Sequence, residues 1–238
     1  MKILSLDSTA IVSTVAICDD EKLLAQFTLN NGNTHSETLL PMIEASLKLL
    51  KMNINDIELF ACSAGPGSFT GVRIGAATIK GLAFGKNKPC VGVSSLEALA
   101  YNMIGVNGLV CPVMNARRSQ LYNALFLCEN GKLKRLCEDR LISVFDLEEE
   151  LRKYADMPIY LCGDGYDIAK DAFTKVKVCD TPVIQTYQSA YSVALCALDA
   201  ARQDLLTSDS ELVPVYLRAS QAERERLEKL KNEENKNQ

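Results

Sequence analysis

The feature that most constrains this chain is an order of strand-like and helix-like segments that occurs twice. In each half, three β-rich segments precede a helix, and two further strand–helix pairs follow. The first half has strand-like segments at 2–7, 11–19, 22–30, 57–65 and 90–93, helical spacing over 36–51 and 69–84, and a third helix opened by Ser94 and Ser95. The second half has strand-like segments at 109–116, 121–129, 132–143, 159–163 and 175–180, and helical spacing over 144–154, 164–173 and 189–206. This alternation predicts an α/β protein built from two β-β-β-α-β-α-β-α halves.

Two copies of this order are the topology of the duplicated actin-like fold, which sugar kinases and Hsp70-type ATPases share, and we expect that fold here. The turn at 105–108 divides the chain into an N-terminal lobe, 1–104, and a C-terminal lobe, 105–218. Residues 219–238 form a charged C-terminal tail of mixed sign, which we expect to be a solvated helix that frays.

The composition indicates a globular protein and excludes several other classes. Of the 238 residues, 47% are apolar, which is enough for one large domain or two small lobes. The formal net charge is −4 and there is no basic block, so direct, tight binding of nucleic acid is not expected. No apolar run reaches the roughly 18 residues of a membrane span, and the N-terminal run is too short for a signal peptide. We therefore expect no membrane association and a cytoplasmic protein.

Residues that would carry metal or phosphate chemistry are missing from the expected places. His35 is the only histidine, so a metal site with two imidazoles cannot form. In ATP-using proteins of this fold, the turn after the first strand of each half cradles phosphate and needs glycine for close approach. These turns read Asp7-Ser8-Thr9-Ala10 and Asn115-Ala116-Arg117-Arg118-Ser119, without glycine and with Asn115 where an acid would help to hold magnesium. The hydroxyls of Ser8 and Thr9 could bind phosphate, but we expect a structural role for them, and no catalytic, cofactor-binding or metal-binding residues in this chain.

A cluster of glycines lies in Gly65-Pro66-Gly67-Ser68-Phe69-Thr70-Gly71, between a strand and a helix. It has neither the G-x-G-x-x-G spacing nor the lysine of a P-loop. Two interpretations stay open. The cluster either contacts an anion at the helix N-terminus, or it forms a tight turn in which Ser68 caps the helix.

The helix after this cluster carries Gly71, Gly75 and Gly81, and each interior glycine costs about 1 kcal/mol relative to alanine. Close approach of another backbone would offset that cost, and the neighbour is either a helix of the same chain or a helix of a partner subunit. Arg73 lies among these small residues and is expected to find a carboxylate or a partner carbonyl.

Two further polar segments have structural interpretations. Thr34-His35-Ser36-Glu37 has the spacing of a capping box at the start of the helix over 36–51. Arg117 and Arg118 follow a strand beside the cleft between the halves, and we expect a solvated turn there, because two charges supply little affinity for phosphate.

Four sequence blocks occur in a characteristic order: 35–43, the GPGSFTGVRIG block at 65–75, the VSSLE block at 93–97 and the PVYLR block at 214–218. Together they resemble the TsaB (YeaZ-type) family of bacterial proteins, which take part in threonylcarbamoyladenosine synthesis on tRNA. The resemblance covers about residues 1–218. The chain departs from the family at 115–118, where Asn115-Ala116-Arg117-Arg118 stands in place of a DARR-type motif.

The resemblance implies a non-catalytic partner or scaffold subunit. In this family TsaB is the obligate partner of its paralogue TsaD, which transfers threonylcarbamoyl to adenosine 37 of tRNAs that read ANN codons, and the ATPase TsaE docks on the pair. For this chain the resemblance implies a heterodimer with TsaD, contact with TsaE, a homodimer when alone, and tRNA contact only through the complex. It implies no cofactor on this chain alone, and it leaves room for a nucleotide at the interface with TsaD and TsaE.

Family members pair through helices of the first half, which correspond to 36–51 and 69–84 here. The interface residues expected from the resemblance are His35, Glu37, Leu40, Ile43, Gly71, Arg73, Ile74, Gly75, Ala77 and Thr78. Two other functions are weighed against this one. A stand-alone ATP-dependent phosphotransferase would use Asp7 near magnesium, and a metallopeptidase, the least favoured alternative, would need ligands that the chain lacks.

Overall fold

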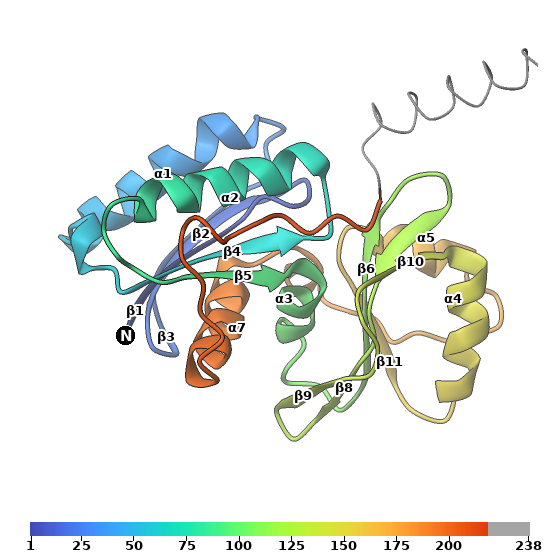
Figure 1. The fold of residues 1–238 in the computed structure, drawn as a ribbon. Helices are drawn as coiled ribbons and strands as arrows, with labels where there is room; N and C mark the ends of the chain where they lie inside the picture. The colour runs from blue at the N-terminus through green and yellow to red at the C-terminus, as the bar shows by residue number, and fades with distance from the viewer. Residues whose placement is uncertain (219–238) are drawn as a thin grey trace, which may run out of the picture.

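A computed structural model describes residues 1–218, so the expected tail at 219–238 lies outside the described residues. The first half forms a five-stranded sheet in the order β3-β2-β1-β4-β5 (Figure 1). Its strands are β1 (Lys2–Asp7), β2 (Ser13–Asp19), β3 (Lys22–Leu29), β4 (Leu59–Gly65) and β5 (Cys90–Ser94). β2 pairs antiparallel with β1 and β3, and β4 pairs parallel with β1 and β5. The predicted ends of these strands agree with the structure to within two residues.

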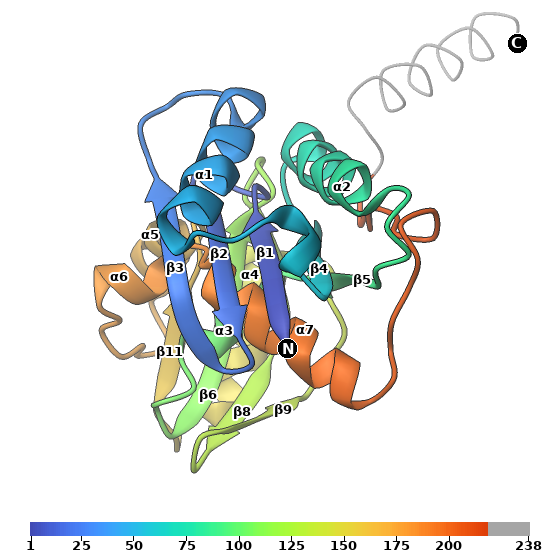
Figure 2. The ribbon, with the colours of Figure 1, turned by 90° about the vertical axis from the view of Figure 1, so that its left-hand side faces the viewer.

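Helices cover both faces of this sheet. The helices of the described chain are α1 (His35–Leu50), α2 (Phe69–Ala83), α3 (Ser95–Tyr101), α4 (Val144–Leu151), α5 (Tyr166–Ala172), α6 (Val183–Thr186) and α7 (Ala190–Arg202), with short 3-10 helices at Ile54–Asp56 and Arg152–Tyr154. α1 and α2 lie on one face and α7 lies on the other (Figure 2). Side chains alternate along β1, so Leu4 and Leu6 pack with α1 and α2, whereas Ile3 packs with α7.

The second half repeats the strand order, with its outer strands broken. β6 (Gly108–Asn115) lies at the centre and β11 (Ile159–Cys162) pairs parallel with it. Along the other edge of β6 run β7 and β8, which pair in turn with β10 and β9. These four are β7 (Gln120–Asn123), β8 (Phe126–Glu129), β9 (Lys132–Arg135) and β10 (Arg140–Ser143).

The single strand expected at 132–143 is wrong, because residues 136–139 divide it into β9 and β10. The continuous strand expected at 121–129 is also wrong, because Ala124 and Leu125 interrupt it. The break faces Pro112 of β6, which has no N–H to donate to a neighbouring strand. Asn123 Nδ2 instead donates to Pro112 O at 3.0 Å and to Ala124 O at 2.9 Å. A side-chain amide therefore replaces part of the backbone ladder, and the strand bends into β7 and β8.

The strand expected at 175–180 is reduced to an isolated bridge between Cys179 and β11. The residues before it are held by the buried side chain of Glu148 on α4, whose carboxylate accepts the N–H groups of Thr174 and Lys175. Backbone N–H groups that donate to a carboxylate cannot also donate to a neighbouring strand. This explains why the apolar alternation at 175–180 does not produce a full strand.

The two halves exchange one helix each, and α3 and α7 lie between the sheets (Figure 1). α3 follows the first sheet in the chain, but Leu96 and Leu99 pack in the core of the second sheet. α7 comes from the second half, but Val193 and Ala197 pack in the core of the first sheet. α7 also ends at Arg202, short of the expected 206. Each sheet is therefore completed by a helix that comes from the other half of the chain.

This architecture is the duplicated actin-like fold that the order of elements predicted. Within residues 1–218, every helix falls short of the length or the apolar character needed to cross a bilayer.

We expect Glu148→Gln to lower the free energy of unfolding by about 1–2 kcal/mol at pH 7, because a charged acceptor binds N–H groups more strongly than an amide does. The N–H donors of Lys175 and Thr174 hold the pKa of Glu148 below its ordinary value. A carboxylate whose pKa is lowered by folding stabilises the protein at pH values above its pKa in the unfolded chain. This stabilisation is lost as the pH falls through the lower pKa of the folded protein.

The difference in unfolding free energy between wild type and Glu148→Gln should therefore shrink below about pH 4, which urea unfolding at several pH values measures. Glu149→Gln is the matched control, because this neighbour makes solvent-exposed ion pairs with Arg152 and Lys175 and should matter much less. Identical pH profiles for wild type and Glu148→Gln would contradict the prediction.

Candidate functional site

The turn after β1 is organised around the carboxylate of Asp7. Its Oδ1 accepts bonds from Thr9 N and Thr9 Oγ1, both at 2.7 Å, and its Oδ2 accepts one from Ser63 Oγ at 2.5 Å. Burial raises the pKa of Asp7, while these donors act to lower it. Ser8 Oγ donates to Gly71 O at 2.8 Å. Asp7, Ser8 and Thr9 are each 1% exposed, so the turn presents neither a hydroxyl nor a carboxylate to phosphate or magnesium.

His35 fixes the loop between β1 and β2. Its Nε2 lies 2.8 Å from Ala10 O, and its Nδ1 lies 2.5 Å from Ser13 Oγ. Because a carbonyl can only accept, Nε2 donates to Ala10 O, and in the neutral ring Nδ1 accepts from Ser13 Oγ. The predicted capping box is wrong, since Thr34 is the N-cap residue of α1 but its side chain makes no capping bond. The histidine joins the start of α1 to the middle of the loop and to the first residue of β2.

The glycine cluster at 65–71 is a tight turn that packs against this chain's own backbone. A Cβ on Gly67 would lie 2.5 Å from Thr9 O, and a Cβ on Gly71 would lie 1.9 Å from Ser8 O. Ser68 caps α2 as predicted, by accepting from Gly71 N at 3.3 Å. Of the two interpretations left open, these contacts support the structural turn.

The interior glycines of α2 are of two kinds. A Cβ on Gly75 would lie 2.7 Å from Ser8 Oγ, so Gly71 and Gly75 both lie against the turn after β1. The close neighbour of this part of the helix therefore belongs to the same chain. Gly81 is exposed, and outside its own helix no atom of residues 1–218 would come within 4 Å of a Cβ there. The packing explains Gly71 and Gly75 but does not explain Gly81.

Arg73 contacts aromatic rings, and among the described residues its side chain makes no ion pair with an acid; the expected carbonyl of a partner stays a prediction. Its guanidinium lies 3.7 Å from the centre of the Phe69 ring, and its Nε donates to Tyr216 Oη at 2.8 Å. The rings of Phe69 and Tyr216 lie 4.8 Å apart. Tyr216 belongs to the PVYLR block, so two sequence blocks from opposite ends of the chain meet here. Sequence analysis missed this contact, because neither block contains a signal that points to the other.

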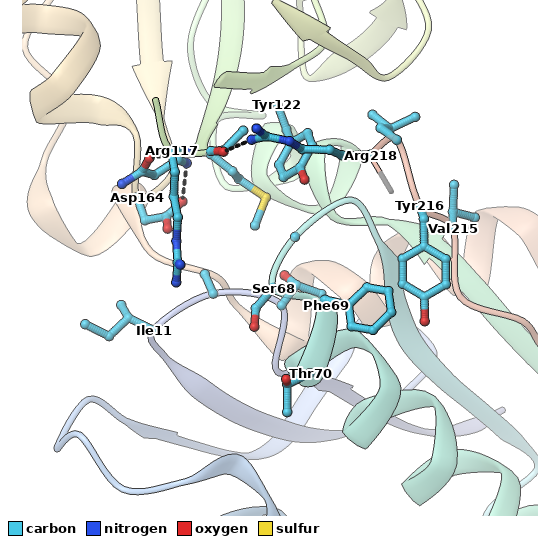
Figure 3. A pocket seen from close by; sticks show the side chains of 17 residues that line it. Ile11, Ser68, Phe69, Thr70, Arg117, Tyr122, Asp164, Val215, Tyr216 and Arg218 are labelled. Atoms are coloured by element: carbon cyan, nitrogen blue, oxygen red, sulfur yellow. Dashed lines mark hydrogen bonds between the residues drawn. The ribbon is translucent and has the colours of Figure 1, made fainter. Parts of the chain in front are cut away.

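A cleft of about 510 Å³ opens between the halves beside these turns (Figure 3). Its walls come from three parts of the chain: residues 9–11 and 67–70 of the first half, residues 114–117 with Tyr122 and Asp164 of the second half, and residues 215–218. Arg117 extends from its turn towards Ile11 on the opposite wall, as Figure 3 shows. Arg118 is exposed and does not line the cleft, so only one of the two arginines lies where the sequence placed both.

Asp164 is an acid of the cleft that sequence analysis missed. It lies between β11 and α5, and its Oδ1 accepts from Asn115 N at 3.2 Å. Burial raises the pKa of Asp164 to about 6. The sequence feature that could have indicated Asp164 is its position between Gly163 and Gly165, directly after a predicted strand. Asn115 Oδ1 is used within its own turn, where it accepts from Arg117 N at 2.8 Å. Among the described residues, no three His, Cys, Asp or Glu side chains gather as a metal site would require.

The expected interface residues differ in their exposure. Ile43, Gly71 and Gly75 are buried within this chain, and His35, Ile74 and Thr78 are half-buried. The exposed members are Glu37, Leu40, Arg73 and Ala77. They lie on α1 and α2, which run side by side over the first sheet (Figure 2). The buried glycines and Ile43 cannot form part of an exposed surface in this conformation.

Comparisons with known proteins agree with this architecture. The sequence model of the family described as "TsaD: tRNA N6-adenosine threonylcarbamoyltransferase" matches residues 22–226. The "tRNA threonylcarbamoyladenosine biosynthesis protein TsaB" of Bacillus subtilis (strain 168) is 30% identical over 234 residues, which are 97% of this chain and 100% of that protein. TsaB of Escherichia coli (strain K12) is 37% identical over 134 residues, which are 55% of this chain and 58% of that protein.

A solved structure from Pseudomonas aeruginosa, described as an uncharacterized protein with similarity to peptidase YEAZ, shares the fold. Its TM-score is 0.79 at 22% identity, and the match covers 91% of this chain and 99% of that one. The two lobes of the fold and the match to the TsaD family model define an actin-like protein of the TsaD type. Within that class, the chain belongs to the TsaB (YeaZ-type) family of tRNA threonylcarbamoyladenosine biosynthesis proteins.

Gly71→Ala and Gly81→Ala add the same methyl group to the same helix and are expected to have opposite effects. Gly71→Ala should destabilise the fold by about 1–3 kcal/mol, because the methyl group would overlap Ser8 O. Gly81→Ala should stabilise it by up to about 1 kcal/mol, since the helix gains a better former and nothing is displaced. Denaturant unfolding of both variants measures the two shifts, and shifts of the same sign would count against this assignment of the glycines.

Proposed function

We propose that this chain is the non-catalytic partner subunit of TsaD in the synthesis of threonylcarbamoyladenosine on tRNA. Family membership supports a role in this modification. The observation that carries the non-catalytic role is the burial of Asp7, which is 1% exposed and whose carboxylate oxygens accept bonds from Thr9 and Ser63 inside the chain. A carboxylate shut off from solvent in this way is poorly placed to position a magnesium ion or to act as a base.

The surface proposed for TsaD is the outer side of α1 and α2. Leu40 is 55% exposed there, and the neighbouring helix presents the small, exposed residues Ala77 and Gly81. Small residues let a partner helix approach closely, and an exposed leucine gains from being covered. Gly81 supports the proposal because its own chain leaves space around it. In the absence of TsaD, the same surface would pair two copies of this chain.

The rest of the assembly follows from the family. TsaE docks on the TsaD pair, tRNA is reached only through the complex, and this chain holds no cofactor of its own. A nucleotide would lie at the interface with TsaD and TsaE. The complex acts in the cytoplasm.

Ala77→Arg is expected to weaken pairing with TsaD by at least about 100-fold, because the interface would bury an uncompensated charge. Ala172→Arg on α5 is the matched control, since it places the same charge on an exposed helix position of the second half. Calorimetric titration of TsaD with each folded variant measures the affinities. Unchanged affinity of Ala77→Arg would place the interface elsewhere.

Depletion of this protein in its host should lower threonylcarbamoyladenosine in bulk tRNA, and the wild-type gene should restore it while Ala77→Arg should not. Mass spectrometry of digested tRNA gives the readout. Unchanged levels after depletion would contradict the proposed function. ATP turnover by the isolated chain that is lost in Asp7→Asn would instead favour a phosphotransferase.

A further inference from the structure

Residues 203–218, which we call the strap, connect the two halves beside the cleft. The strap leaves the end of α7, passes along the first half and ends beside the second half (Figure 1). Its last four residues, 215–218, line the cleft (Figure 3). The strap is therefore the part of the cleft wall that contacts both the first and the second sheet regions.

Hydrogen bonds fix the first part of the strap to the first half. Thr207 and Cys90 exchange backbone bonds, with Thr207 N donating at 2.9 Å and Cys90 N at 2.8 Å. Lys80 Nζ on α2 donates to Ser210 O at 3.2 Å and to Leu212 O at 3.1 Å. The side chain of Leu212 is 3% exposed and belongs to the core beneath α1 and α2.

The glycine cluster provides space for the next part of the strap. Val215 N donates to Ala64 O at 2.7 Å. A Cβ on Gly65 would lie 2.4 Å from Val215 O, and the φ of Gly65 is +120°, so glycine is required at this contact. Tyr216 then packs on Phe69. Residues 207–216 are thus held on the first half by backbone hydrogen bonds, by bonds from Lys80, and by the packing of Leu212 and Tyr216.

A single hydrogen bond joins the strap to residues 105–189, which build the second sheet and its outer helices. Arg218 Nη1 donates to Ala116 O at 2.7 Å, and within residues 1–218 the strap makes no other hydrogen bond to 105–189. Ala116 precedes a turn in which Arg117, Arg118 and Ser119 all have positive φ, between 54° and 63°. Residues other than glycine rarely adopt this left-handed backbone conformation. The turn therefore depends on contacts with the surrounding residues to keep its shape.

We propose that the strap is a latch that holds the cleft closed, with Arg218 as its releasable end. The contacts at 207–216 keep the strap on the first half, whereas the bond to Ala116 can break without disturbing either core. The acceptor is an uncharged carbonyl, so the closure depends on the position of the guanidinium and not on a carboxylate that titrates. A binding partner that draws the chain away at residue 218 would open the cleft. The inference does not depend on the proposed pairing with TsaD.

Hydrogen exchange of the full-length protein, read by mass spectrometry, tests the latch. Arg218→Ala should speed exchange at the Ala116 and Gln120 amides by about tenfold, while the Val215 amide stays protected. Tyr216→Phe is the control, because it removes the hydroxyl that Arg73 contacts within the first half but keeps the ring and Arg218. It should leave exchange at 116–120 unchanged.

Three patterns are distinguishable for Arg218→Ala. Faster exchange confined to 116–120 and the cleft walls supports the latch. No change at 116–120 overturns it, and so does equal acceleration across both halves of a folded protein, which would mean a general loss of stability. If Arg218→Ala does not fold, the same patterns are read from Arg218→Met, which keeps an aliphatic stem but has no N–H group to donate to Ala116 O.

Discussion

The hydrogen-bonded carboxylate of Asp7 is the interaction on which the first half depends. A carboxylate in an apolar interior must be surrounded by donors, and Thr9 and Ser63 provide them. This arrangement sets the path of the chain just after β1. The carbonyls that follow then meet the glycine cluster, α2 and His35 at fixed places. The same interaction keeps the carboxylate of Asp7 buried, at 1% exposed.

The predictable part of the fold is the part where local pattern and tertiary packing agree. β1 ends at Asp7 as its alternation indicates, and α2 begins at Phe69 because Ser68 is a good cap. The second half departs from its pattern where a distant group intervenes. Pro112 and Asn123 break a strand whose composition is continuous, and Glu148 takes the backbone donors that a further strand would need. Such effects depend on residues that meet only after folding.

In the candidate site, too, local pattern predicts some features, whereas contacts between distant segments decide others. The sequence indicates which residues matter near 65–75, and it correctly relates the small residues of α2 to a close neighbour. It does not say which neighbour, and for Gly71 and Gly75 the answer is Ser8 of the same chain. The partners of Arg73 and the position of Asp164 also depend on contacts between segments far apart in the sequence. No described residue accounts for the glycine at position 81, because the space around it within the chain is open.

The exchange of α3 and α7 has a consequence for how this protein is made. The underside of the first sheet, with Ile3 and Ala61, is covered by a helix that begins only at Ala190. During synthesis, strands completed early keep much of that apolar face uncovered until the ribosome has released α7. A nascent molecule of this kind cannot complete its first lobe before part of the second has been made, so chaperones that shield apolar surface are needed until α7 has emerged.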